Sequence, residues 1–394
     1  MPKYLASGVF VEQTTFAHGP IAPAATAATA FVGATLKGPW HTASQVNSLA
    51  EYREIFGDPS PASAVSISVL QFFSNGGRQA VIVRTAAAGG RARARAGHAE
   101  IVGDAAKGTG IHALGSSPAV GLLVTPEAGV MTSREHDALL KAVLAYCDRQ
   151  RIFYIVDAPM PRSTRDPFAS VIGWAGRAGA IKHANAAVYF PRVRMSVPSE
   201  KPATAVCSAS GAIAGVYART DHQHGVWRAP AGANATLLGV TGIEAQPSDD
   251  QAARLTDAGI NPLRSIHNGG IVVWGARTLA SAAHTSEWKY VPVRRLSLLL
   301  QRSVEAGLGW TVFEPNGDPL WAQIRLSVSS FLHHLFQRGA FTGASAREAY
   351  FVKCGRETMT ENDISSGQII VMIGFAPLRP AEFVVLRLEF RAGH

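Results

Sequence analysis

Ala30-Phe31-Val32-Gly33-Ala34 begins the stretch of sequence that decides the fold. This apolar run reads as a buried β-strand, and a second run, Ala80-Val81-Ile82-Val83-Arg84, reads the same way. Residues 62–73 between them favour a helix, because one stripe carries Val65, Val69 and Phe72. A strand, a covering helix and a further strand form the repeating unit of parallel sheets. The stretch therefore predicts an α/β domain.

The same alternation continues along the chain. Apolar strands are expected at 121–124, 152–157 and 186–190, and a helix that begins at Ser133 separates the first two. Continuous apolar strands between amphipathic helices are typical of a sheet that is covered on both faces. Residues 191–262 are richer in turn formers.

The last 120 residues are expected to form a compact α+β unit that starts with a strand at 271–274. We predict a helix near 294–306 and another with Asp318 as N-cap and Pro319 at N1. Ser345 and Glu348 match a capping box. Strands are expected at 350–352, 368–375 and 382–390.

Composition limits the class of protein. The chain has 394 residues, of which 47% are apolar and only 16% charged. Disorder is excluded as a global description, because it requires low hydrophobicity and high charge. No early segment has the order of a signal peptide, and no window has about 18 consecutive apolar residues. The sequence therefore predicts a soluble protein, cytoplasmic where it is made, with two or three domains.

A net charge of +9 raises the question of nucleic acid binding. The densest basic cluster is Arg91, Arg93 and Arg95, which lies between glycines and has no interleaved aromatic residues. Proteins that bind single-stranded nucleic acid usually combine basic residues with interleaved aromatic residues. The cluster is therefore interpreted as a solvated loop. An acidic protein partner is the alternative.

The spacing of cysteine and histidine residues does not indicate a metal site or a disulfide framework. Cys147, Cys207 and Cys354 are odd in number, far apart and without a CxxC pair, so we interpret them as buried small hydrophobes. His222 and His224 would share one face of a strand, but no further ligand completes a site. His333 and His334 point about 100° apart on a helix. We expect no metal and no cofactor.

A hydrolase remains the alternative function. Asp157 follows an apolar strand, His183 and His222 lie downstream of it, and Ser208 or Ser210 precedes Gly211, so an Asp, a His and a Ser can be found in a subtilisin-like order. Order alone carries little information in a chain with 13 histidines. No Gly-x-Ser-x-Gly elbow and no phosphate-binding glycine loop are present.

The sequence resembles the contractile tail sheath protein family, which includes the sheaths of phage tails, pyocins and extracellular contractile injection systems. The resemblance runs in order over nearly the whole chain. It rests on the segments 8–12, 72–77, 215–221, 225–230, 262–279, 288–296, 312–317 and 376–383. The short, Ala/Gly/Arg-rich stretch near 86–120 departs from larger phage sheaths, which carry an inserted outer domain there.

The resemblance implies a fold of α/β plus α+β type. Its parts would be an N-terminal arm at 1–20, a subtilisin-like but non-catalytic central domain at 21–270, a C-terminal domain at 271–380 and a C-terminal arm strand at 381–394. The insertion near 86–120 would be reduced.

The resemblance also implies a non-enzymatic function. Members of this family form stacked hexameric rings around an inner tube, and their contraction drives the tube through a target envelope. Expected partners are further copies of the chain, the inner tube protein, and the baseplate and tail terminator proteins, without nucleic acid or membrane insertion. Assembly would take place in the bacterial cytoplasm, before the chain becomes part of a phage tail or a phage-tail-like particle.

Two sets of site residues follow from the resemblance. The arms of neighbouring protomers would exchange strands through Val9, Phe10 and Val11 at one end and Val384, Leu386 and Leu388 at the other. The C-terminal domain would contact an acidic tube surface, with Arg325, Arg338 and Arg347 as candidate residues. Each arginine could equally be an ordinary solvated charge.

Overall fold

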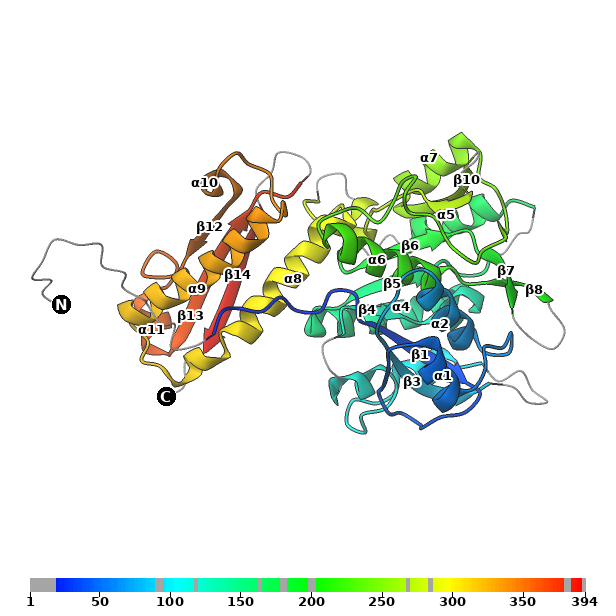
Figure 1. Cartoon of the computed structure of the whole chain (residues 1–394), viewed down its shortest axis with the longest axis horizontal. Helices are drawn as coiled ribbons and strands as arrows, with labels where there is room; N and C mark the ends of the chain where they lie inside the picture. Colours follow the sequence, from blue (N-terminus) through cyan, green and yellow to red (C-terminus); the bar gives the residue numbers. More distant parts are fainter. Residues whose placement is uncertain are drawn as a thin grey trace, which may run out of the picture.

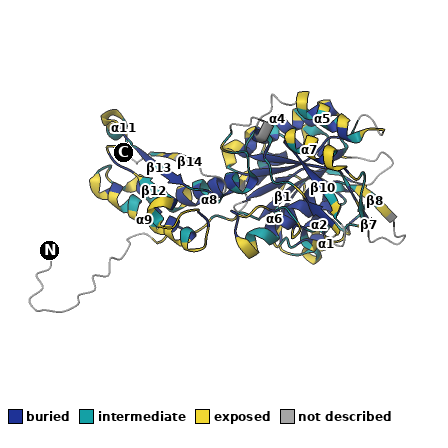
Figure 2. Cartoon of the chain, turned by 90° about the horizontal axis from the view of Figure 1, so that it is seen from above, coloured by how far each residue is buried: buried dark blue, intermediate teal, exposed yellow. Residues whose placement is uncertain are grey.

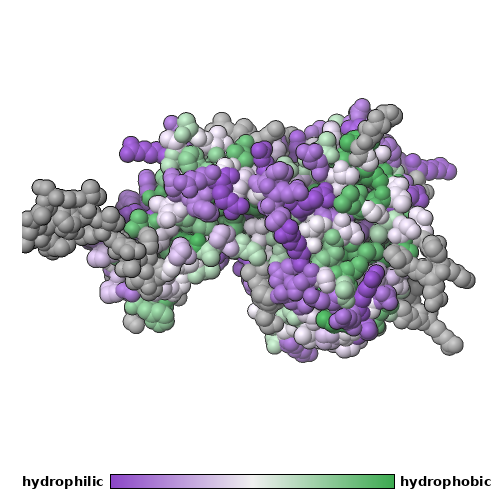
Figure 3. All heavy atoms as spheres, viewed as in Figure 1, coloured by the Kyte–Doolittle hydropathy of each residue, from purple (hydrophilic) through white to green (hydrophobic). Residues whose placement is uncertain are grey.

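The chain folds into two lobes joined by a long helix (Figure 1). The computed structural model describes residues 19–88, 95–116, 120–161, 165–177, 183–197, 203–266, 270–282, 286–378 and 384–391. In the space-filling view the two lobes are separated by a notch at the lower edge (Figure 3). Hydrophobic residues lie scattered among hydrophilic ones on the visible face. None of the helices in the described part combines the length and apolar character that crossing a bilayer requires.

The larger lobe is built on an eight-stranded sheet with the order β11-β10-β6-β5-β4-β1-β3-β2. The six strands from β10 to β3 run parallel, and β11 and β2 are antiparallel edges. In chain order the strands are β1 (Thr29–Thr35), β2 (Ser44–Val46), β3 (Ala80–Ala87), β4 (Leu122–Val124), β5 (Phe153–Asp157), β6 (Ala186–Phe190), β10 (Ile260–Ile266) and β11 (Gly270–Val273). The predicted parallel α/β sheet is confirmed.

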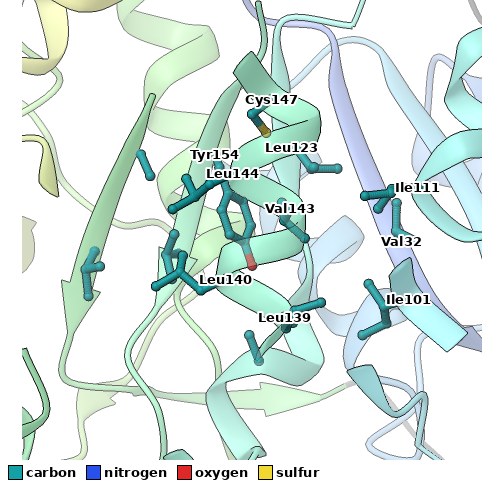
Figure 4. Close-up of a cluster of buried hydrophobic side chains, with 14 of the residues drawn as sticks. Val32, Ile101, Ile111, Leu123, Leu139, Leu140, Val143, Leu144, Cys147 and Tyr154 are labelled. Atoms are coloured by element: carbon teal, nitrogen blue, oxygen red, sulfur yellow. The ribbon is translucent and has the colours of Figure 1, made fainter. Parts of the chain in front are cut away.

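Helices cover both faces of this sheet (Figure 2). One face carries α1 (Leu49–Phe56), α2 (Ala64–Ser74) and α6 (Ser210–His224), and the other carries α3 (His98–Val102), α4 (Ser133–Gln150), α5 (Pro167–Arg177) and α7 (Asp249–Asp257). Figure 4 shows Leu140, Val143 and Leu144 of α4 packed with Leu123 and Tyr154 of the sheet. Burial of these apolar stripes supplies the main driving force for the layered architecture.

Shorter elements complete the lobe. A second sheet has the order β8-β7-β9 and consists of β7 (Val193–Val197), β8 (Ala203–Cys207) and β9 (Gly242–Ile243). Among the described residues of this lobe, 3-10 helices are η1 (Gly110–Ser116), η2 (Pro126–Val130) and η4 (Leu279–Ala282).

The smaller lobe is the predicted C-terminal α+β unit. It packs α8 (Val291–Gly307) and α9 (Asp318–Gln337) against a three-stranded sheet of order β12-β13-β14. The remaining elements are η5 (Gly309–Phe313), α10 (Ala346–Ala349), β12 (Tyr350–Lys353), α11 (Glu361–Ser365), β13 (Gln368–Phe375) and β14 (Val384–Arg391). The predicted apolar stripe of α9 lies in the core of this lobe.

Some local predictions were wrong. Gly317 is the N-cap of α9, so Asp318 and Pro319 are its first two helical residues. Ser345 is the N-cap of α10, as expected, but the capping box is absent: its side chain makes no capping hydrogen bond, and Glu348 accepts from the main-chain N–H of Ala344.

The turn-rich stretch 191–262 proved more regular than its prolines indicated. It contains the buried helix α6 and the start of β10, whose Pro262 pairs with Phe190 of β6. β11 pairs with β10 in the central sheet, which favours a domain boundary after Val273 rather than at 270. The domain limits themselves stay predictions.

Residues 19–28, which precede β1, lie along α8 and connect the two lobes (Figure 1). The main-chain N–H of Ala24 donates to Ser303 Oγ at 2.9 Å, and Arg302 donates to the carbonyl of Ala25 at 3.1 Å. Ile21 belongs to the core of the smaller lobe. This segment therefore ties the first strand of the large lobe to the small one.

Candidate functional site

The C-terminal sheet ends on a long strand edge. β14 pairs with β13 in antiparallel register over eight residues, from Val384 opposite Phe375 to Arg391 opposite Gln368. In the part of the chain that the structure describes, no strand pairs with the other side of β14. Such an edge presents main-chain donors and acceptors to an added strand.

The sequence placed Val384, Leu386 and Leu388 in an arm that leaves the protomer. In the structure they lie opposite Phe375, Ile373 and Val371 of the same chain, so β14 completes its own sheet. Leu388 is only 6% exposed and packs into the core of the small lobe, whereas Arg387 and Glu389 face outward. Val9, Phe10 and Val11 lie outside the described residues.

Exposed large apolar side chains occur in both lobes, and those of the small lobe lie on η5 and α9. Phe313 at the end of η5 is 89% exposed and its neighbour Val312 is 38% exposed. Leu326 of α9 is 51% exposed and lies out of phase with the buried stripe of that helix. Sequence reasoning missed these residues, although the phase of Leu326 could have revealed it. Large exposed apolar side chains on a structured domain suit a partner contact.

The three basic candidates do not form one patch. Arg325 and Arg338 are 13 positions apart on and just after α9, which places them about 20 Å apart along the axis and about 140° apart around it. Arg325 donates to the carbonyl of Cys354, and the Arg338 guanidinium lies 5.5 Å from the centre of the Trp227 ring. Arg347 lies exposed on α10.

The structure brings the candidate serines to Asp157 but not the candidate histidines. Asp157 is buried at the end of β5, where it accepts from Ser210 Oγ and from the main-chain N–H groups of Ala209 and Ser210. Ser208 Oγ donates to the carbonyl of Pro126 at 2.8 Å.

The histidines lie elsewhere. His183 pairs with Asp148 at 2.7 Å, and His222 is exposed near the end of α6. His136 Nε2 contacts the main-chain oxygen of Asp157 at 2.9 Å, so this ring positions the strand end rather than a serine. A serine nucleophile needs a base within hydrogen-bond reach, and here the hydroxyl protons are held by a carboxylate and a carbonyl.

Burial dominates the titration of this region. It raises the pKa of Asp157 to about 6, against the effect of its hydrogen bonds. Cys147 and Cys354 are buried, as predicted, whereas Cys207 is only partly buried, so the prediction for that residue was wrong. Burial raises the pKa of the Cys207 thiol, and of the Cys354 thiol in the small lobe, to about 12. Among the described residues no three His, Cys, Asp or Glu side chains gather as a metal site requires. His222 and His224 lie on a helix rather than a strand.

Comparisons with known proteins place this geometry in context. The family model "Phage tail sheath protein central domain" matches residues 122–279, and "Phage tail sheath C-terminal domain" matches residues 283–391. The tail sheath protein of Enterobacteria phage T4 is 26% identical over 175 residues, 44% of this chain and 25% of that protein. A putative prophage major tail sheath protein of Pseudomonas aeruginosa is 27% identical over 187 residues, 46% of this chain and 45% of that protein. The matched region thus spans less than half of these relatives.

Solved structures match over nearly the whole chain. The sheath of an extracellular contractile injection system, PVC, in its contracted state is 28% identical with a TM-score of 0.73, covering 98% of both chains. The contracted helical sheath of the anti-feeding prophage is 29% identical with a TM-score of 0.72, covering 98% of this chain and 99% of that one. Both lobes and the helix between them are therefore shared with these structures.

Proposed function

The chain belongs to the contractile tail sheath protein family, and we propose that it polymerises as stacked hexameric rings around an inner tube. Contraction of this sheath would drive the tube through a target envelope. The observation that carries the proposal is the match of 98% of the chain to two contracted sheaths.

The domain assignment belongs to the same proposal. The central lobe is subtilisin-like in topology without a hydrolytic site, a view that its parallel sheet and its separated Ser and His side chains support. Arms at 1–20 and 381–394 would link protomers, and the small lobe would face the tube.

Strand exchange accounts for how protomers stay connected while rings move. The free side of β14 offers an eight-residue edge to Val9, Phe10 and Val11 of a second copy. Val384, Leu386 and Leu388 would either keep their place beside β13 or swap into the same place in a neighbour, because an exchanged strand makes identical contacts. Main-chain hydrogen bonds supply the link, and alternate side chains fix its register.

Contraction without nucleotide requires that the contracted sheath lattice has a lower free energy than the extended one. Burying about 400 Å² more apolar surface per protomer contributes roughly 10 kcal/mol before entropic costs. Exposed residues such as Phe313 and Leu326 are candidates for that burial. A bistable interface of this kind switches between two arrangements rather than stretching continuously.

The remaining partners are the tube, baseplate and tail terminator proteins of a phage tail or phage-tail-like particle. For the tube, Arg347 is the preferred basic candidate, because it is exposed whereas Arg325 and Arg338 already contact other parts of the chain.

Electron microscopy tests the proposal directly. The expressed chain, alone or with its tube partner, should form hollow striated cylinders with six-fold rings. Persistent monomers that cleave peptides would instead favour the hydrolase alternative.

A further inference from the structure

The central sheet contains a topological switch point, where the connections of two neighbouring strands lead to opposite sides of the sheet. β1 is connected to β3 on one side, whereas β4 is connected to β5 on the other, and β1 and β4 are neighbours. In sheets of this kind ligands bind in the crevice outside the carboxyl ends of two such strands. The crevice here lies between Ala34 at the end of β1 and Pro126 just after β4.

A pocket of about 670 Å³ opens at this crevice. Its wall is mostly apolar and is formed by the end of β1, the start of α2, η2 and strand β8. Lining residues include Ala34, Ala62, Ile67, Val130 and Val206. Small side chains keep the space open, and a volume of this order suits a ligand rather than a single water.

Glu127 forms the polar part of the wall. Its side chain is buried, and Oε1 accepts a hydrogen bond from the main-chain N–H of Ala34 at 2.7 Å. The register of β1 shifts between Gly33 and Ala34. A Cβ atom at Gly33 would lie 2.2 Å from Oε2, so the carboxyl fits only over a glycine. Oε2 has no hydrogen-bond partner among the described residues.

Few charges face this carboxyl. Arg95 lies at the mouth of the pocket, where it donates to the carbonyl of Val130 at 2.6 Å and lies 3.9 Å from Glu135. The phenols of Tyr52 and Tyr154 are buried nearby, and α2 carries no charged residue. Arg95 acts on the Glu127 carboxyl only through its charge, which holds the pKa of Glu127 below what burial alone would give, and Oε2 of Glu127 has no bonded donor among the described residues.

We propose that this pocket binds an aliphatic ammonium group, which donates to Glu127 Oε2 while its alkyl chain lies on the apolar wall. A single free oxygen suits a compact ammonium better than a guanidinium, because the guanidinium fork needs two acceptors. The wall has to shift slightly on binding, since Oε2 is buried. The group comes either from a free alkylamine or from a lysine of a second copy, which share this chemistry.

Calorimetric titration of the full-length chain with pentylamine tests the site, with pentanol as a neutral probe of the same length. Glu127→Gln should weaken pentylamine binding at least tenfold, whereas Asp249→Asn on α7, which does not line the pocket, should leave it unchanged. Burial raises the pKa of Glu127 to about 7, so affinity should increase about tenfold from pH 6 to pH 8 as the carboxyl loses its proton. Ala62→Leu should block the pocket without altering the carboxyl, which keeps the test valid if Glu127→Gln does not fold.

Carbodiimide cross-linking of assembled cylinders distinguishes the two sources. An amide between Glu127 and a lysine, found by mass spectrometry, identifies a second copy as the donor. Pentylamine binding without such a cross-link identifies a free amine. Equal binding of pentanol, binding unaffected by both Glu127→Gln and Ala62→Leu, or neither binding nor a cross-link would overturn the proposal. The cross-linking arm rests on the proposed assembly into cylinders, whereas the pentylamine titration does not, so a failed titration leaves the sheath proposal untouched.

Discussion

Arg295 and Asp221 form a buried ion pair that joins the two lobes. Arg295 Nη1 and Nη2 lie 2.8 and 2.7 Å from the two carboxylate oxygens of Asp221, and the side chains are 3% and 6% exposed. Arg295 also donates to the carbonyl of Thr26 at 3.1 Å and lies 4.7 Å from the centre of the Tyr217 ring. The first turns of α8 are thereby fixed to α6 and to the segment before β1.

Asp221→Asn should lower the free energy of unfolding by about 3–5 kcal/mol, because it leaves the Arg295 charge buried without its partner. Urea unfolding of unpolymerised protomers measures the change. Asp249→Asn is the matched control, since its ion pair with Arg264 is exposed at the carboxylate and contributes under about 1 kcal/mol. Equal effects of the two variants would contradict a special role for the buried pair.

Glu127 should make the protomer less stable as pH rises. Its pKa is about 7 in the folded chain against 4.5 for an unperturbed carboxyl, so the folded state binds the proton more tightly. The resulting stabilisation is complete below about pH 4.5 and is lost as pH rises through 7, and its size is about 3 kcal/mol.

Urea midpoints between pH 5 and 8 measure this effect. Glu127→Gln should reduce the dependence of the urea midpoint on pH. The dependence that remains at the lower end of this pH range should come from Asp157, whose pKa is about 6. Glu135→Gln should leave the slope above pH 6 unchanged, because hydrogen bonds from Thr132 lower the pKa of that carboxyl. An unchanged slope in Glu127→Gln would show that the carboxyl does not titrate in this range.

Removing the strand arms should separate folding from assembly. Deletion of residues 1–15 should change the free energy of unfolding by less than about 0.5 kcal/mol, because the contacts described above do not involve these residues, yet abolish cylinders in electron micrographs. Proline at Val384 and Leu386 removes main-chain donors from β14 and should also block polymerisation, but it weakens the pairing with β13 of the same protomer, so its urea midpoint is measured beside it. Normal cylinders from either variant would disprove strand exchange.

Phe313→Ser should affect assembly rather than folding. A side chain that is 89% exposed contributes little to protomer stability, but burial against a partner makes it a candidate hot spot of about 2 kcal/mol or more. The critical concentration for polymerisation, measured by sedimentation, should rise at least about tenfold. Ile55→Ser, which changes an exposed apolar residue of α1, is the control and should polymerise normally.

Arg347→Glu should weaken tube binding and its dependence on salt while leaving protomer stability unchanged. The guanidinium is exposed on α10, and an exposed charge facing an acidic surface acts mainly on association rate. Co-sedimentation with tubes at low and high salt measures this effect. Arg325→Ala should instead lower the urea midpoint, because it removes the donor to the Cys354 carbonyl. If Arg325→Ala alone reduced tube binding, the tube surface would lie along α9.

Local sequence was sufficient for the framework of both lobes. The apolar runs at β1, β3 and β5 and the stripe of α9 could be predicted because helix and strand periodicities are properties of neighbouring residues. The family could also be recognised in this way, since its motifs are contiguous. β10 was missed because Asn261 and Pro262 are turn formers that only the pairing with β6 holds in a strand.

Contacts between distant residues were decided by the tertiary structure alone. Asp157, Ser208 and Ser210 could be arranged in a plausible order, but only the folded sheet shows that the candidate histidines lie elsewhere. In the same way β14 could be predicted as a strand, whereas its pairing with β13 of the same chain could not. The sequence around Glu127 does not mark it as buried, because its carboxyl is held by Ala34 of β1, which lies 93 positions earlier in the chain. Sequence periodicity specifies which face of an element is apolar, while packing free energy, summed over the whole chain, specifies which faces and edges meet.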